Sequence, residues 1–177
     1  MNKARSAADS DALTGVASRA AFMSMLADAY GRATEAEGTL TVATLDVDGL
    51  HDPAHADCDD SRDAILTAFA RRLEDAYETY GGEIGRIGPE TFAVLLPGVD
   101  ARSVAQASKA LAESGVSVSD DATLAIRAGF TTLDPESSSS FPAPAALLTA
   151  AEQALDAARS AGGAAVRAFV PQSRNAA

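Results

Sequence analysis

The chain has a single cysteine, no tryptophan and fewer basic than acidic residues. One thiol, Cys58, excludes a disulfide within the chain and is usual for proteins of a reducing compartment such as the cytoplasm. The 14 Lys and Arg residues against 25 Asp and Glu give a formal net charge of −11, which argues against broad electrostatic binding of nucleic acid or of an anionic membrane. A phosphate-bearing ligand would therefore be held locally, by a metal ion or by a few placed donors.

Long apolar runs are also missing. No stretch approaches the roughly 20 apolar residues of a membrane span, and the first five residues lack the apolar core of a secretory signal. Aromatic residues make up 5% of the chain and hydrophobic residues 47%, so we expect a core of Ala, Leu, Val and Ile. We expect a soluble, cytoplasmic domain over residues 11–170, with a flexible lead-in at 1–10 and a tail at 171–177.

Apolar spacing predicts an order of alternating helices and strands. Helical spacing covers four segments: 19–31, a stretch from Ile65 to Tyr80 that ends before Gly81-Gly82, 100–113 and 145–161. β-branched and apolar runs predict strands at 39–47, 83–87, 91–96, near 122–132 and at 164–170. A tight turn at Gly88-Pro89 joins the second and third strands, and 134–144 has the composition of a loop. The order predicts an α/β fold, an α+β sandwich with a ferredoxin-like sheet that contains antiparallel strands and is flanked by helices.

Two acids end the first predicted strand, in the run Leu45-Asp46-Val47-Asp48. Carboxylate oxygens are hard ligands that suit Mg²⁺, and a magnesium ion at a strand end can serve phosphoryl transfer. The competing interpretation is that strand ends meet solvent, where acids are common. The hairpin that follows, with Glu90 in its turn, favours the first interpretation.

Five ordered motifs are spread along the chain. They are 11–19 (Asp-Ala-Leu-Thr-Gly-Val-Ala-Ser-Arg), 45–48 (Leu-Asp-Val-Asp), 63–66 (Asp-Ala-Ile-Leu), 88–92 (Gly-Pro-Glu-Thr-Phe) and 154–162 (Ala-Leu-Asp-Ala-Ala-Arg-Ser-Ala-Gly). Together they resemble the motifs of the GGDEF family, the diguanylate cyclases. The fourth stands where the family has Gly-Gly-Asp/Glu-Glu-Phe. The resemblance runs from about residue 9 to 170 and implies a nucleotidyl-cyclase-like fold.

The resemblance also implies a site. In the family two domains face each other, each presents one GTP, and together they form cyclic di-GMP. By resemblance Asp46, the Val47 carbonyl and Glu90 would hold Mg²⁺. The nucleotide contacts carried over are Asp63, Gly88 and Arg159, the last in place of a lysine.

Several departures from the family pattern accompany the retained motifs. Thr91 stands where the family has an acid needed for catalysis, and Pro89 replaces a glycine, removing an N–H and adding a ring. A family lysine falls at His51 and the usual Ser-x-Gly reads Arg127-Ala128-Gly129. An Arg-x-x-Asp product site, expected at 79–82, is absent from the sequence.

Three functions follow from this pattern. We expect a degenerate GGDEF domain that does not cyclise GTP and acts as a regulatory, interaction or GTP-sensing module in cyclic di-GMP signalling, with a protein partner or a second copy as its partner. The alternatives are an active cyclase and a purely protein-binding or dimerisation domain. A separate hypothesis concerns His51, His55 and Cys58, which could bind zinc, although their spacing matches no standard zinc module.

Overall fold

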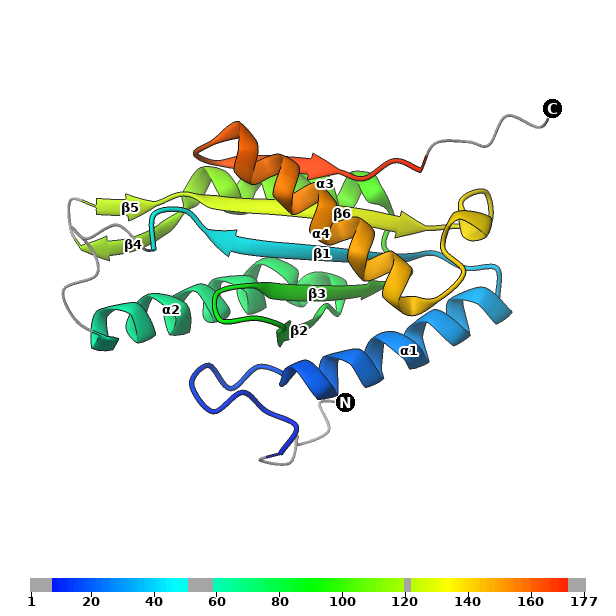
Figure 1. The fold of residues 1–177 in the computed structure, drawn as a ribbon, viewed down its shortest axis with the longest axis horizontal. Helices are drawn as coiled ribbons and strands as arrows, with labels where there is room; N and C mark the ends of the chain where they lie inside the picture. Colours follow the sequence, from blue (N-terminus) through cyan, green and yellow to red (C-terminus); the bar gives the residue numbers. More distant parts are fainter. Residues whose placement is uncertain (1–7, 51–58, 120–121, 172–177) are drawn as a thin grey trace.

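A mixed five-stranded sheet in the order β2-β3-β1-β6-β7 forms the centre of the protein (Figure 1). The structure, a computed structural model, describes residues 8–50, 59–119 and 122–171. The strands of this sheet are β1 (Leu40–Val47), β2 (Glu83–Arg86), β3 (Phe92–Pro97), β6 (Ile126–Leu133) and β7 (Ala165–Ala168). Strand β1 runs antiparallel to both of its neighbours, β2 runs antiparallel to β3, and β6 pairs with β7 in parallel.

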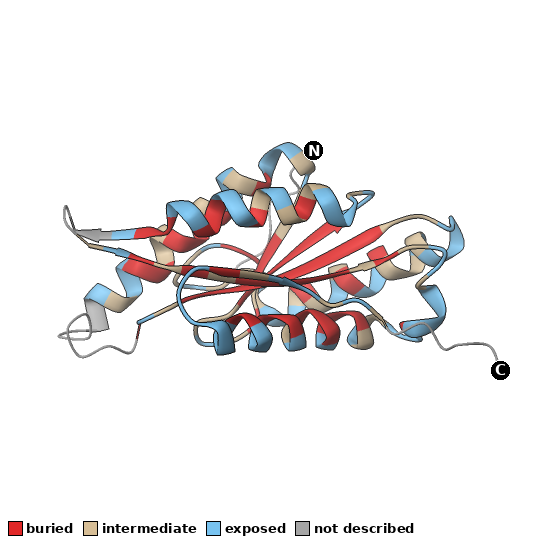
Figure 2. Cartoon of the chain, turned by 90° about the horizontal axis from the view of Figure 1, so that it is seen from above, coloured by how far each residue is buried: buried red, intermediate tan, exposed pale blue. Residues whose placement is uncertain are grey.

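Four helices cover the two faces of the sheet. They are α1 (Arg19–Glu35), α2 (Asp59–Tyr77), α3 (Ala101–Ser114) and α4 (Pro144–Ala161). Helices α2 and α3 lie on one face and α1 and α4 on the other, with buried residues concentrated between the layers (Figure 2). The predicted α/β sandwich is therefore confirmed, and so are the four helices.

Strand β1 is buried along its whole length because both of its faces are covered. Successive side chains of a strand point to opposite faces. Ala43, Leu45 and Val47 join the core under α2 and α3, whereas Leu40 and Val42 join the core under α1 and α4. Thr44 is on the second side too, and its hydroxyl donates to the Ala151 carbonyl of α4 at 3.0 Å. This alternation places the next even residue, Asp46, under the end of α4.

Two short strands outside the main sheet were not fully predicted. β4 (Val116–Ser119) and β5 (Ala122–Leu124) form a separate antiparallel ribbon. The strand predicted near 122–132 is divided into β5 and β6 at Ala125, and β4 was not predicted. The run Val-Ser-Val-Ser alternates as a half-buried strand does, but at four residues it is too short to stand out in the sequence. The predicted loop at 134–144 contains a short 3₁₀ turn, η2 (Ser138–Ser140).

None of the helices in the described residues combines the length and the apolar character that crossing a bilayer needs.

Candidate functional site

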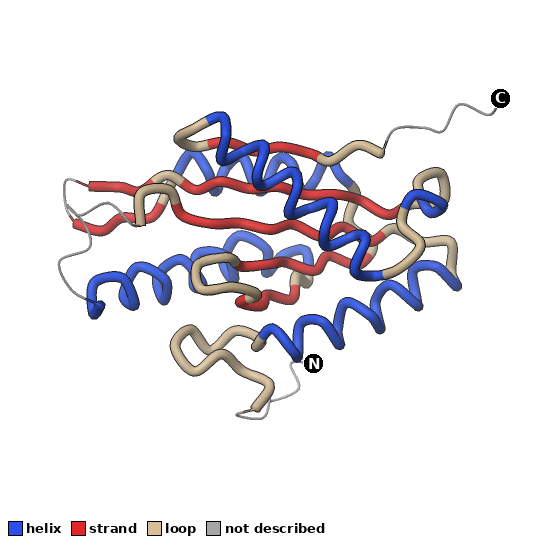
Figure 3. Tube along the Cα trace, viewed as in Figure 1, coloured by secondary structure: helices blue, strands red, loops and turns tan. Residues whose placement is uncertain are grey.

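The carboxyl end of β1, the β2–β3 turn, the start of α2 and the end of α4 meet at one edge of the fold (Figures 1 and 3). Asp46 lies in this edge with only 4% of its surface exposed. A buried carboxylate is stable only with charged or hydrogen-bonding partners. The identity of those partners determines what the site can bind.

Arg127 is the first partner of Asp46. It lies on β6 directly opposite Asp46 in the strand register, so the sheet itself holds the two residues together. Its Nε donates to Asp46 Oδ1 at 2.8 Å and its Nη1 donates to Asp48 Oδ1 at 2.9 Å. One guanidinium group thus bridges the two acids of the strand end. The Arg127 side chain is 15% exposed, which limits its freedom to move away.

Arg159 of α4 is the second partner. Its Nε donates to Asp46 Oδ2 at 2.7 Å and its Nη1 donates to Asp156 Oδ1 at 2.6 Å. Burial lowers the pKa of the Arg159 guanidinium, but the hydrogen bonds and negative charges of Asp46 and Asp156 outweigh it and hold that pKa above its ordinary value. Arg159 therefore stays charged, and both oxygens of Asp46 accept from cations.

Asp48 is held from a second direction by the segment after α4. The backbone N–H of Gly163 donates to Asp48 Oδ2 at 3.2 Å. Gly163 has a φ of 62°, in the left-handed region that glycine adopts readily. The chain reverses at this point to enter β7, so the turn that closes the sheet also contacts the strand end.

The β2–β3 turn carries the five signature positions. The N–H groups of Ile87 and Gly88 both donate to the Thr91 carbonyl, at 2.9 and 3.1 Å. The Arg86 guanidinium donates to the Pro89 carbonyl through Nη2 at 2.5 Å. Phe92 then enters the core, where its ring meets Phe69 of α2 edge-on at 5.2 Å between centroids. The frame of the hairpin is intact, and its turn is closed by its own backbone.

Glu90, the one acid in this turn, forms an ion pair with Arg62 of α2. Thr91 beside it is partly buried and presents a hydroxyl where the family has a carboxylate. Gly88 is also only partly exposed, because the Thr91 side chain lies next to it. The single carboxylate of this turn is therefore already paired.

A loop at the N-terminus is tied to the same hairpin. The Asp11 carboxylate accepts from the Thr14 N–H at 3.0 Å, from the Thr14 hydroxyl at 2.7 Å and from Arg86 Nη1 at 3.2 Å. The N–H of Ala17 donates to the Ile84 carbonyl and that of Arg86 to the Ala17 carbonyl, both at 2.9 Å. The Asp-Ala-Leu-Thr-Gly motif is thus a structural turn that buttresses β2.

The pKa of Asp11 reflects these contacts. Burial raises it, but the hydrogen bonds from Thr14 and the bonds and charge of Arg86 lower it by more. The net effect is a pKa below the ordinary value of 3.8. Asp11 is therefore ionised at neutral pH.

The positions predicted to bind metal are separated by these contacts. Asp46 and Val47 end β1, while Glu90 lies in the hairpin turn with its own arginine. Within residues 8–50, 59–119 and 122–171, no group of three or more His, Cys, Asp or Glu side chains gathers at metal-binding distance. The carboxylates that the resemblance assigns to Mg²⁺, those of Asp46 and Glu90, are engaged with guanidinium groups, and this donor arrangement does not fit a divalent cation.

The residues predicted to bind the nucleotide also lie in different surroundings. Asp63 is exposed on α2, whereas Arg159 lies against Asp46. The zinc hypothesis for His51, His55 and Cys58 concerns residues outside those that the structure describes. Sequence reasoning did not foresee the roles of Arg62 and Arg86, or that Arg127 bridges the two acids. The replacement of Ser by Arg at 127 was the one available signal for the last of these.

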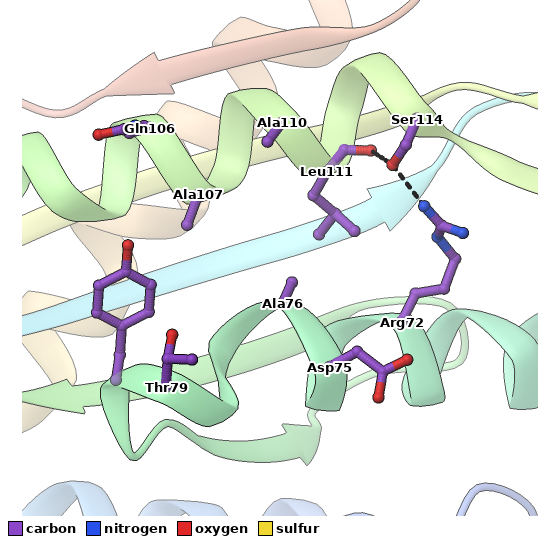
Figure 4. Close-up of a pocket in the computed structure, with 10 residues that line it drawn as sticks. Arg72, Asp75, Ala76, Thr79, Gln106, Ala107, Ala110, Leu111 and Ser114 are labelled. Atoms are coloured by element: carbon purple, nitrogen blue, oxygen red, sulfur yellow. Dashed lines mark hydrogen bonds between the residues drawn. The ribbon is translucent and has the colours of Figure 1, made fainter.

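A separate hollow of about 490 Å³ lies between α2 and α3 (Figure 4). At one end Arg72 Nη2 donates to the Ser114 hydroxyl at 2.5 Å, and that hydroxyl donates to the Leu111 carbonyl at 2.8 Å. Its lining includes Thr79 and Tyr80, at the positions where the family has its product site, but none of the residues of the strand-end site. The two regions are therefore distinct.

The family model described as "Diguanylate cyclase, GGDEF domain" matches residues 8–165. The chain belongs to the GGDEF family. Its fold resembles the GGDEF domain of DgcB from Caulobacter crescentus in complex with c-di-GMP, with a TM-score of 0.80, 22% identity and coverage of 94% of this chain and 99% of that chain. No curated protein sequence matches the chain.

Two further solved structures have the same fold. One is the active GGEEF domain of a diguanylate cyclase from Vibrio cholerae, with a TM-score of 0.74, 16% identity and coverage of 85% of this chain and 95% of that chain. The other is the diguanylate cyclase SiaD in complex with its activator SiaC from Pseudomonas aeruginosa, with a TM-score of 0.71, 24% identity and coverage of 92% of this chain and 62% of that chain. At these identities the likeness establishes the fold alone. The predicted family is confirmed.

Proposed function

We propose that this protein is a non-cyclising GGDEF domain that acts as a regulatory module in bacterial cyclic di-GMP signalling. The observation that carries the proposal is the chemistry of the hairpin turn. Thr91 replaces the acid of the fourth signature position, and Glu90 is paired with Arg62. A threonine hydroxyl does not ionise near neutral pH, so it cannot accept the proton that an ionised carboxylate can.

The size of the loss can be bounded. A positioned general acid or base contributes about 10²–10⁴-fold to the rate of a reaction. Pro89 adds a second loss, because it lacks the N–H that a glycine would present and its ring restricts the turn. The N–H of Gly88 is directed to the Thr91 carbonyl rather than toward a ligand. Together these features support a domain that binds or transmits without catalysis.

The proposed module keeps some groups that suit a guanine nucleotide. Asp63 is exposed at the start of α2, where a carboxylate can accept from the N–H groups of guanine, and Arg159 supplies a charged guanidinium at the opposite side of the strand end. We therefore propose weak recognition of GTP at this edge, in a cytoplasmic setting. A protein partner or a second copy would transmit the bound state. SiaD with its activator SiaC is an example of a cyclase that binds a protein partner.

The deciding experiment is a product assay with a parallel binding measurement. The purified chain is incubated with GTP and Mg²⁺, and cyclic di-GMP is measured by mass spectrometry, while isothermal titration measures GTP binding with ATP as the control. We expect no cyclic di-GMP, and heat that saturates with GTP but not with ATP. Formation of cyclic di-GMP would establish the active cyclase instead.

If neither cyclic di-GMP formation nor GTP binding is found, the remaining function is that of a purely protein-binding or dimerisation domain. The domain would then act through protein contacts alone. Asp63→Asn is the matched binding variant, because it changes an exposed side chain that is not among the arginine contacts of Asp46. Loss of the heat of GTP binding in Asp63→Asn would support the assignment of the Asp63 carboxylate to the guanine base.

A further inference from the structure

Asp46 and Asp48 form a two-carboxylate site whose four oxygens already have partners within the chain. The two acids lie on the same side of the strand end, two residues apart, and Arg127 bridges them at 2.8 and 2.9 Å. Arg159 takes the remaining oxygen of Asp46 at 2.7 Å. A divalent cation between two carboxylates would occupy the same position and supply the same charge as these two guanidinium groups.

The strand register holds Arg127 permanently next to Asp46. Asp46 and Arg127 are directly paired across β1 and β6, inside the five-stranded sheet. Asp46 and Arg127 are 6% and 15% exposed in their side chains. Charge-assisted hydrogen bonds between such shielded groups are about twice as strong as neutral ones. Moving Arg127 aside would break two of them and leave the carboxylates of Asp46 and Asp48 without this guanidinium.

A metal ion would also compete poorly on geometry. Mg²⁺ requires near-octahedral oxygen ligands at about 2.0–2.1 Å and releases its water reluctantly. Both oxygens of Asp46 and both oxygens of Asp48 already accept hydrogen bonds. Binding would therefore need displacement of two arginines and of the Gly163 N–H.

We propose that Arg127, assisted by Arg159, is a built-in cation that replaces the divalent metal at the end of β1 and closes this site to Mg²⁺ and Mn²⁺. The inference rests on the proposed function, since it describes how the same edge of the domain became non-catalytic. Nucleotide bound at this edge is then held independently of divalent cations. Arg127 is a specificity-determining residue, and replacing it should restore a metal site.

The test uses Mn²⁺ alone as the probe, with the free ion measured by electron paramagnetic resonance. Four proteins are compared: the wild type, Asp46→Asn, Arg127→Ser and Arg127→Ser with Asp46→Asn. Arg127→Ser installs the residue type that the family has at this position. Arg167→Ser is the matched control, because it makes the same chemical change on an exposed part of β7.

We expect Asp46→Asn to leave the Mn²⁺ binding of the wild type unchanged. Arg127→Ser should gain one Mn²⁺ per chain with an affinity at least about tenfold higher than any binding to the wild type. The added Asp46→Asn change should abolish that gain, and Arg167→Ser should show none. The melting temperature of Arg127→Ser should rise by roughly 5–10 °C at a Mn²⁺ concentration of about 100 times the dissociation constant, while that of the wild type stays constant.

Two results would overturn the inference. One is a Mn²⁺ ion on the wild type that Asp46→Asn removes. The other is a folded Arg127→Ser protein, judged by circular dichroism, that gains no site. If Arg127→Ser does not fold, Arg127→Gln carries the same test, because glutamine keeps a hydrogen-bond donor but not the charge.

The two proposals fail separately. Mn²⁺ at Asp46 of the wild type without cyclic di-GMP would overturn only the built-in cation. Cyclic di-GMP from the wild type would overturn the proposed function.

Discussion

The hydroxyl of Tyr77 on α2 lies 2.8 Å from the hydroxyl of Ser108 on α3, and neither side chain is exposed to solvent. This pair is a buried polar contact between the two helices, in addition to the contact of Arg72 with Ser114. Burial raises the pKa of Tyr77 to about 12. The hydrogen bond with Ser108 lowers this pKa in part, and the neighbouring Tyr80 raises it further. The folded state therefore strongly prefers the protonated phenol.

The first prediction concerns alkaline stability. The pKa of Tyr77 in the folded state is raised, so the folded state binds this proton more tightly than the unfolded state, whose tyrosine pKa is about 10. The stabilisation is complete below about pH 10 and is lost as the pH rises toward about 12. We expect the free energy of unfolding in urea to fall across this window. Tyr77→Phe should remove that part of the pH dependence, and should cost about 1 kcal/mol at pH 7 because Ser108 loses its partner.

The second prediction concerns acid stability at Asp11. Its pKa is lowered in the folded state, so its stabilising effect is present above about pH 3.8 and disappears as the pH falls through the lower folded value. Asp11→Asn should therefore reduce the free energy of unfolding at pH 7, and the two proteins should converge in strong acid. Asp28→Asn, an exposed change on α1, is the control. Equal differences at pH 7 and pH 2 would contradict the assignment.

The third prediction concerns the contact of α4 with β6. A Cβ on Gly129 would lie 2.0 Å from the Leu155 nitrogen and 2.5 Å from the Ala154 carbonyl carbon, both in the backbone of α4. The helix would have to move, and it carries Arg159. Gly129→Ala should cost about 3 kcal/mol or more in the free energy of unfolding.

The matched control for this change is Gly31→Ala on α1. A Cβ there meets nothing within 4 Å. Because alanine is the better helix former, this variant should be stabilised by roughly 0.5–1 kcal/mol. Similar destabilisation in both variants, measured by urea unfolding, would show that the close approach of α4 to β6 is not the cause.

The fourth prediction concerns repair of the hairpin. Thr91→Glu with Pro89→Gly restores the acid and the glycine of the signature but leaves Asp46 held by two arginines. We expect no cyclic di-GMP from this double variant in the presence of GTP and Mg²⁺, while its far-ultraviolet circular dichroism stays that of the wild type. Product formation would mean that the turn alone limits catalysis.

The fold was largely readable from the sequence, and particular elements show why. The strand 39–47 and the helix 145–161 are long apolar segments with clear spacing, and the structure places β1 at Leu40–Val47 and α4 at Pro144–Ala161. The ribbon of β4 and β5 was harder, because its strands have only four and three residues and give little periodicity to read. Short strands are specified by their pairing partners more than by their own composition.

The site was readable only in part. The family resemblance assigned Asp46, Glu90 and Arg159 to one site, and the structure joins Asp46 to Arg159, but the resemblance could not show that Arg127 faces Asp46. These two residues are 81 positions apart, and their contact depends on the register between β1 and β6. A one-residue shift of that register would turn the arginine to the other face of the sheet. The pairing of Arg62 with Glu90 likewise depends on how α2 packs on the hairpin.

The central position of β1 also has a consequence for how the chain folds during synthesis. Its partners are β3, which begins at Phe92, and β6, which ends at Leu133, so a strand that is buried along its whole length in the folded domain leaves the ribosome long before either neighbour exists. Such non-local pairing slows folding and leaves strand edges open to other chains. Residues 40–47 therefore lack both of their strand partners until the second half of the domain has been made.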